Sequence, residues 1–107
     1  MTPDELVLIL EQHARYLRNQ RGSARANLSM QNLSGQDLSN VNLREAKLAG
    51  VNLNRCILKG ADLAHADLSG SNMHGAFLRG ANLAGANLKK ADLREGFLLT
   101  PSNDNRK

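Results

Sequence analysis

The three histidines and the one cysteine of this sequence can act as proton carriers, metal ligands or a nucleophile, and they are His13, His65, His74 and Cys56. A cysteine beside a histidine can act as an activated nucleophile, and histidines that converge with a third ligand can hold zinc. A single cysteine excludes an internal disulfide and a zinc site made of several cysteines. Whether the histidines and Cys56 meet depends on the elements that position them.

One large apolar residue recurs every five residues from residue 26 to residue 100, without interruption. The fifteen positions are Leu28, Leu33, Leu38, Leu43, Leu48, Leu53, Leu58, Leu63, Leu68, Met73, Leu78, Leu83, Leu88, Leu93 and Leu98. A small or medium-sized residue, most often Ala, stands two positions earlier, and Asn or Asp stands directly before eleven of the fifteen. A period of five fits neither an α-helix nor a β-strand, so the chain must bend at regular intervals.

The repeat predicts a solenoid rather than a globule. Asn, Asp and Gly accept turn conformations, so each unit supplies a short extended piece followed by a corner. Leu and Ala then face inward once per corner, and stacked coils pair their backbones at about 4.8 Å. Only three of the 107 residues are aromatic, Tyr16, Phe77 and Phe97, which suits a narrow interior and disfavours an enzyme with an aromatic-lined cleft.

This pattern resembles the consensus A(D/N)LXX of the pentapeptide-repeat family. The literal matches are Ala26-Asn27-Leu28, Ala61-Asp62-Leu63, Ala66-Asp67-Leu68, Ala81-Asn82-Leu83, Ala86-Asn87-Leu88 and Ala91-Asp92-Leu93. The resemblance implies an all-β solenoid, a right-handed quadrilateral parallel β-helix in which four repeats, or twenty residues, make one coil. The fifteen repeats then make just under four coils. Ile57, Phe77 and Phe97 are the apolar exceptions at the Asn/Asp position, and their spacing of twenty supports this coil length independently.

With twenty residues per coil, the side chains that could do chemistry do not converge. His65 and His74 fall on opposite faces and His13 falls in a preceding helix, so we expect solvated histidines and no metal site. Cys56 takes the inward small position and is expected to be a buried, inert thiol. The sequence therefore predicts a protein that is not an enzyme, with no catalytic, cofactor-binding or metal-binding residues.

A polar column on one face also has a structural explanation. It consists of Asn32, Asn52, Asn72 and Asp92, each twenty residues from the next. Side-chain amides that stack along a coil are an ordinary structural device, so this column is not predicted to bind a ligand.

Of the net charge of +4, the solenoid carries +2 and each of the two ends of the chain adds one. Assigned repeat by repeat, the four faces carry +2, 0, +1 and −1, so no face forms the basic stripe that nucleic acid needs. The best-known activity that the family resemblance implies is mimicry of DNA by long, acidic, dimeric rods that bind DNA gyrase. This chain is short and mildly basic, so regulation of gyrase or of nucleic acid is the disfavoured alternative function.

The chain divides into three predicted segments. Residues 1–25 are expected to form a capping helix and linker, residues 26–100 the β-helix, and residues 101–107 a polar tail. Thr2 and Glu5 can make a capping box, which predicts a helix from residue 3 to about residue 19. The acidic start and the short apolar run after it fit neither a secretion signal nor a membrane span, so we predict a cytoplasmic protein without a membrane partner.

The predicted helix has an apolar side that needs a partner. Its residues are Leu6, Ile9, Leu10, His13, Ala14 and Leu17. We expect this side to lie over the first coil, near residues 28 to 43, where it would close the leucine-lined end of the solenoid. The alternative is that the helix packs sideways on the column of Ile57, Phe77 and Phe97.

The apolar column and the C-terminal end are the candidate interaction sites. The candidate interface residues are Ile57, Lys59, Phe77, Arg79, Phe97 and Leu99. Exposed, contiguous apolar surface usually marks an interface, so the predicted function is a non-enzymatic scaffold or protein-interaction module with an unknown protein partner. We expect a homodimer through the C-terminal end or the Phe77/Phe97 face, or else a tail that folds back over the rings. A further alternative is that these residues are the N-terminal targeting region of a longer polypeptide.

Overall fold

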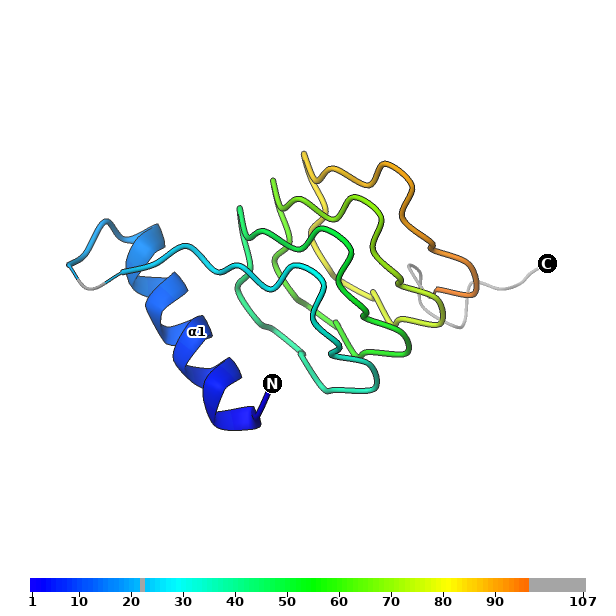
Figure 1. Cartoon of the computed structure of the whole chain (residues 1–107). Coiled ribbons are helices and arrows are strands. Elements are labelled where there is room, and N and C mark those ends of the chain that lie inside the picture. Colours follow the sequence, from blue (N-terminus) through cyan, green and yellow to red (C-terminus); the bar gives the residue numbers. More distant parts are fainter. Residues whose placement is uncertain (22, 97–107) are drawn as a thin grey trace.

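The computed structural model describes residues 1–21 and 23–96, which form one helix followed by a stack of coils (Figure 1). Helix α1 spans Pro3–Leu17. From Asn27 onward, one residue in each repeat pairs in parallel with the residue twenty positions later, as far as the pair Asn72 and Asp92. Four repeats therefore make one coil, and residues 26–96 make about three and a half coils. The predictions for Phe97, Leu99 and residues 101–107 lie outside the described residues.

The pairing within the described coils consists of single bridged residues rather than strands of several residues. Each bridge is strengthened by neighbouring backbone bonds between coils. The Leu28 N–H donates to the Lys47 carbonyl at 2.8 Å, and the Lys47 N–H donates to the Ala26 carbonyl at 2.9 Å. The Met30 N–H donates to the Ala49 carbonyl at 3.0 Å. A corner every five residues leaves no room for a longer ladder.

Each corner is a β-turn whose residue types the sequence dictates. In the first repeat the Gln31 N–H donates to the Leu28 carbonyl at 3.1 Å, which closes the turn. Met30, the third residue of this turn, has a φ of 65°, a left-handed value that type II turns require and that Gly and Asn adopt most easily. The Asn27 side-chain oxygen accepts from the Ser29 N–H at 3.1 Å, so the Asn/Asp position fixes the entry to the turn.

The core is a single column of inward leucines. The repeat residues from Leu28 to Leu78, with Met73 among them, are at most 6% exposed. Most of the small inward residues fill the space between them and are also buried, from Ala26 and Ala46 to Ala76, whereas Val41, Ala81 and Ala86 are partly buried. This packing confirms that large and small inward residues alternate around a narrow interior with no aromatic ring.

Helix α1 begins and ends on local signals. The Thr2 hydroxyl oxygen accepts from the Glu5 N–H at 3.1 Å, and the Glu5 carboxylate accepts from the Thr2 N–H at 2.7 Å, which confirms the predicted capping box. The helix ends at Leu17, two residues before the predicted end. Asn19 adopts a left-handed φ of 57°, and the Gln20 N–H turns back to the Arg15 carbonyl at 2.9 Å, so the last turn closes there.

Helix α1 lies across the N-terminal end of the coil stack (Figure 1). Leu6 is buried in the solenoid core, and Ile9 and Leu10 pack against that core. This arrangement confirms the expectation that the helix covers the first coil. The alternative, sideways packing on the apolar column, is wrong because the helix makes its contacts at the end of the leucine column.

His13 corrects one prediction, because the structure buries it completely instead of exposing it to solvent. The Ala26 N–H donates to His13 Nδ1 at 2.9 Å, so the Nε2–H must donate to the Arg44 carbonyl, which lies 2.8 Å away. The ring also stacks on Tyr16, with the ring centroids 5.8 Å apart. His13 lies on the buried side of the helix because both ring nitrogens find backbone partners in the first coil.

Candidate protein-interaction surface

Ile57 and Phe77 form an exposed apolar pair on one face of the solenoid. The two residues are joined by a parallel bridge, so their side chains lie one above the other on consecutive coils. Ile57 is 36% exposed and Phe77 is 45% exposed, whereas the inward leucines between them are buried. We call this pair the Ile57/Phe77 column. Its third predicted member, Phe97, lies outside the described residues, as does Leu99.

Two cations follow the Ile57/Phe77 column along its length. Lys59 and Arg79 each stand two residues after a member of the column, and both are exposed. The Gly60 N–H donates to the Arg79 carbonyl at 2.9 Å, which holds the two corners on adjacent coils. Neither cation makes an ion pair with another described residue. The structure therefore brings together four of the six predicted interface residues.

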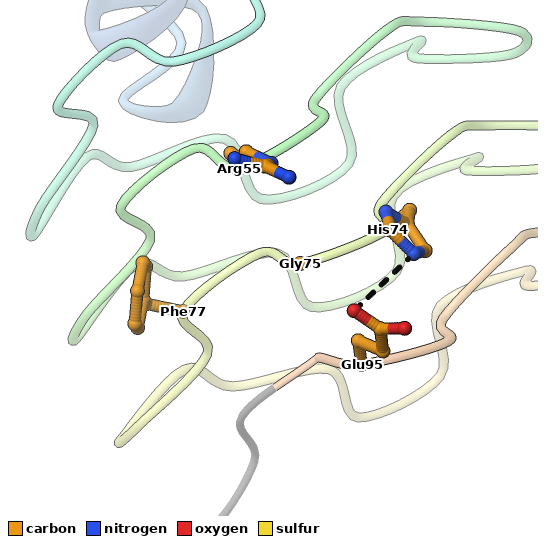
Figure 2. A pocket seen from close by; sticks show the side chains of 5 residues that line it. All are labelled: Arg55, His74, Gly75, Phe77 and Glu95. Atoms are coloured by element: carbon orange, nitrogen blue, oxygen red, sulfur yellow. Dashed lines mark ion pairs between the residues drawn. The ribbon is translucent and has the colours of Figure 1, made fainter.

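A hollow of about 310 Å³ opens beside Phe77 (Figure 2). Its lining residues are Arg55, His74, Gly75, Phe77 and Glu95. Arg55, Gly75 and Glu95 occupy the same corner position on successive coils, so the missing side chain of Gly75 leaves a gap between a cation and an anion. A Cβ atom at Gly75 would lie 3.1 Å from Arg55 Cγ, which shows that the stem of Arg55 passes over the glycine.

The charged groups around the hollow are not equally engaged. His74 Nε2 lies 3.6 Å from Glu95 Oε1, a contact that becomes an ion pair when the imidazole is protonated. Arg94 makes two hydrogen bonds to the Asp92 carboxylate, at 3.0 and 2.8 Å. The side-chain bond from Arg94, with its backbone bond, lowers the pKa of Asp92 to about 2. Arg55 makes no ion pair within residues 1–21 and 23–96.

Sequence reasoning missed this hollow because a glycine at a corner of the repeat predicts only a turn. A useful signal was nevertheless present in the sequence. Once the coil length is twenty, a glycine with a long charged residue twenty positions before it and another twenty positions after it predicts a gap between two charges. Within the described coils, Gly75 is the one corner glycine that is flanked in this way, by Arg55 and Glu95.

The residues with potential catalytic chemistry are kept apart. Cys56 is fully buried, its thiol donates to the Leu33 carbonyl, and burial raises the pKa of the thiol, which confirms that the cysteine takes the predicted buried position. His65 is exposed as expected, while His74 is partly buried. Within the described ranges, no group of three His, Cys, Asp or Glu side chains is placed to hold a metal ion. No helix in that part of the chain is long and apolar enough to cross a membrane.

The side-chain oxygens of the polar column accept hydrogen bonds from the turns of their own repeats. Each of its side-chain oxygens accepts from the N–H two residues later, at 3.0 to 3.1 Å. The four bonds run to Asn32 from Ser34, to Asn52 from Asn54, to Asn72 from His74, and to Asp92 from Arg94. Parallel bridges from Asn32 to Asn52, from Asn52 to Asn72 and from Asn72 to Asp92 stack the four residues along the coils, as expected, and the turn bonds give each side chain a structural role as well.

The geometry defines a solenoid repeat protein with an apolar and basic strip on one face. A family model described as pentapeptide repeats (8 copies) matches residues 24–60 and 61–98, which is more than half of the chain. The chain therefore belongs to the pentapeptide-repeat family. A comparison with curated protein sequences found no match.

Solved structures of other pentapeptide repeat proteins share this fold. The protein Rfr23 from the cyanobacterium Cyanothece 51142 is 30% identical over 71% of this chain, with a TM-score of 0.56. A protein from the thylakoid lumen of Arabidopsis thaliana is 29% identical over 77% of this chain, with a TM-score of 0.50. The chain spans 56% and 57% of the length of these two proteins. The fluoroquinolone resistance protein QnrB1 is 24% identical over 74% of this chain and 50% of its own, with a TM-score of 0.42, so this likeness carries no functional argument.

Proposed function

We propose that this protein is a non-enzymatic protein-interaction module that binds its partner through the Ile57/Phe77 column and the flanking cations Lys59 and Arg79. One observation carries the proposal: the column exposes two large apolar side chains, 36% and 45%, at a position that most repeats give to Asn or Asp. Exposed contiguous apolar surface is typical of interfaces, and aromatic residues and Arg are enriched there. The rigid backbone pairing of the coils supports a role as a preformed scaffold.

The column replaces a favourable turn residue, which argues for a purpose outside the fold. Asn or Asp at this position accepts a hydrogen bond from the turn, as Asn52 does from the Asn54 N–H at 3.0 Å. Ile57 and Phe77 cannot accept that bond, and each keeps more than a third of its surface exposed. A binding role supplies a reason for giving up the bond at two consecutive coils.

Affinity capture from a cell extract tests this proposal with three forms of the full chain. The forms are the natural protein, Phe77→Asn, and the control Met30→Asn. Met30 is 79% exposed and belongs to repeat 26–30, whereas the column position on the same coil, Asp37, belongs to repeat 36–40, so the control also removes an exposed apolar side chain but on another face. We expect the natural protein and the control to retain the same proteins, and Phe77→Asn to lose them. Equal retention by all three forms contradicts the proposal.

A second copy of the chain is one partner that this surface fits. At the C-terminal end of the described coils, Leu83, Leu88 and Leu93 are only partly buried, unlike the leucines of the inner coils. Apolar surface at this end supports a homodimer there or across the Ile57/Phe77 column. Light scattering over a range of concentrations tests the proposal: we expect a concentration-dependent dimer that Phe77→Asn or an end substitution, Leu93→Asn, abolishes. A strict monomer at every concentration contradicts it.

We also infer that the coils wind in a right-handed sense around four sides. Four repeats per twenty-residue coil support four sides, because each repeat contributes one corner. Parallel pairing with a crossover connection is right-handed in nearly all known cases, which supports the hand.

A further inference from the structure

The hollow beside Phe77 and the Ile57/Phe77 column form one continuous surface. Phe77 belongs to both, since it pairs with Ile57 on one side and lines the hollow on the other (Figure 2). A space of about 310 Å³ lies at the lower end of the size range of ligand pockets, and it suits one side chain rather than a large ligand. A partner segment that rests on the column can therefore place a neighbouring side chain in the hollow.

The charge on this surface is predominantly positive. Arg55 lines the hollow, and Lys59 and Arg79 flank the column; none of the three makes an ion pair with another described residue. Two acids lie closest in register, and each has a contact within the chain. Glu95 faces His74 at 3.6 Å, and the Asp37 carboxylate accepts from the Ser39 hydroxyl at 2.6 Å and from its N–H at 3.0 Å.

The geometry of the hollow favours a carboxylate. Gly75 provides a floor without a side chain, and the Arg55 stem passes over it, with Arg55 and Glu95 one coil away on either side of the glycine (Figure 2). A guanidinium group can donate two parallel hydrogen bonds to one carboxylate, which makes arginine the cation best suited to such a group. Glu95 disfavours an additional negative charge deeper in the hollow, so the carboxylate belongs on the Arg55 side.

We propose that the partner bound at this surface presents an extended acidic segment. One large apolar side chain of the segment rests on the Ile57/Phe77 column, and a neighbouring Asp or Glu enters the hollow to pair with Arg55. Further acidic residues lie along Lys59 and Arg79. This inference rests on the proposed function, since it names the chemistry of the partner that the Ile57/Phe77 column binds.

The experiment is a selection of random twelve-residue peptides displayed on phage, with the full chain immobilised and the bare support used for counter-selection. The most enriched sequence is then synthesised with a fluorescent label, and its dissociation constant is measured by fluorescence polarisation. We expect enriched peptides that combine Asp or Glu with Phe, Leu or Ile. No enrichment, or enrichment of basic or uncharged apolar peptides, overturns the acidic-segment inference.

Matched variants assign the carboxylate to the hollow. Arg55→Gln is expected to weaken binding of the synthetic peptide about tenfold, as loss of a charge-assisted pair predicts, while Lys47→Gln on the opposite face leaves it unchanged. Gly75→Asn fills the hollow and should also weaken binding. Its control is Gly70→Asn, since both glycines have left-handed φ values, 72° and 67°, and a Cβ at Gly70 meets no atom within 4 Å.

The outcomes separate the two proposals. If Phe77→Asn abolishes binding but Arg55→Gln and replacement of the peptide carboxylates by amides do not, the column binds a partner and the acidic-segment inference is wrong. If Phe77→Asn leaves binding intact, the proposed function of the column is wrong. If Phe77→Asn, Arg55→Gln and the amide peptide all lose affinity, and salt weakens binding of the natural peptide, the proposed function and the acidic-segment inference are both supported.

Discussion

His13 is the polar link between helix α1 and the first coil, and replacing it tests how the solenoid end is closed. In His13→Leu the volume is nearly kept, but the Ala26 N–H and the Arg44 carbonyl both lose their partners at 2.9 and 2.8 Å. His13 is 0% exposed, so water does not replace the ring without opening the contact between helix and coil. The stacking on Tyr16 is lost as well.

The expected cost follows from the two orphaned groups. Leaving one buried backbone donor or acceptor without a partner costs about 1–3 kcal/mol, so two of them cost about 2–6 kcal/mol if the helix stays in place. Undocking of α1 limits the cost, because it lets water reach both groups, but it exposes Leu6 and its neighbours on the core. His13→Gln can accept from Ala26 and donate to Arg44, so we expect a smaller loss.

Urea unfolding followed by circular dichroism measures these differences, and hydrogen exchange at the Ala26 amide reports the local opening. His65→Asn is the control, because His65 is an exposed histidine at a corner with a left-handed φ of 60°, which Asn accepts, and it makes no such bond. We expect stability to fall in the order natural protein, His13→Gln, His13→Leu, with His65→Asn close to the natural protein. If His13→Leu unfolds at the same urea concentration as His65→Asn and the Ala26 amide stays protected, the contact through His13 does not stabilise the protein and the reasoning fails.

Three further outcomes follow from the described geometry. Ser71 Oγ is buried with no hydrogen-bond partner among the described residues, so Ser71→Ala should raise the free energy of unfolding by about 1 kcal/mol. The control Ser69→Ala removes a hydroxyl that is hydrogen-bonded to Asp67 and should not raise it. A loss of stability in Ser71→Ala would contradict this prediction. Arg94 lowers the pKa of Asp92 from 3.8 to about 2, so the contribution of this carboxylate to stability is present above pH 4 and is lost as the pH falls toward 2. In Arg94→Gln the pKa of Asp92, followed by NMR, should rise toward 3.8. An unchanged pKa would show that the bond to Arg94 does not lower it. The purified protein should leave DNA supercoiling by gyrase unchanged, because its surface is mildly basic and DNA mimicry needs a negative surface. Clear inhibition would favour the alternative function, regulation of gyrase.

The register of the coils could be predicted from the sequence because its signal is strict. Leu28 and its counterparts never slip from the period of five, and the spacing of Ile57 and Phe77 predicts the twenty-residue coil that their bridge confirms. The same register predicts that Cys56 is buried and that His65 and His74 stay apart. These features depend only on which residues share a position in the repeat.

The remaining features depend on contacts that a repeat pattern does not encode. Helix α1 ends at Leu17 because Asn19 takes a left-handed conformation. A single asparagine in a polar stretch does not predict that conformation. The sequence predicts that His13 lies on the apolar side of the helix, but it does not predict its burial. The two backbone groups that bind the ring, Ala26 N–H and the Arg44 carbonyl, lie 13 and 31 positions away in the sequence. The hollow at Gly75 arises from a missing side chain between two long ones on other coils.

Hydrogen exchange of the full chain, with and without a protein retained in the affinity capture, tests the central claim most directly. The natural protein should show slower exchange on binding at residues 57–60 and 77–80, the segments that carry the column and its cations. The face half a coil away, at residues 47–50 and 67–70, should not change. Protection on that opposite face or on helix α1, with the column unaffected, would contradict the claim that this protein acts through the Ile57/Phe77 column.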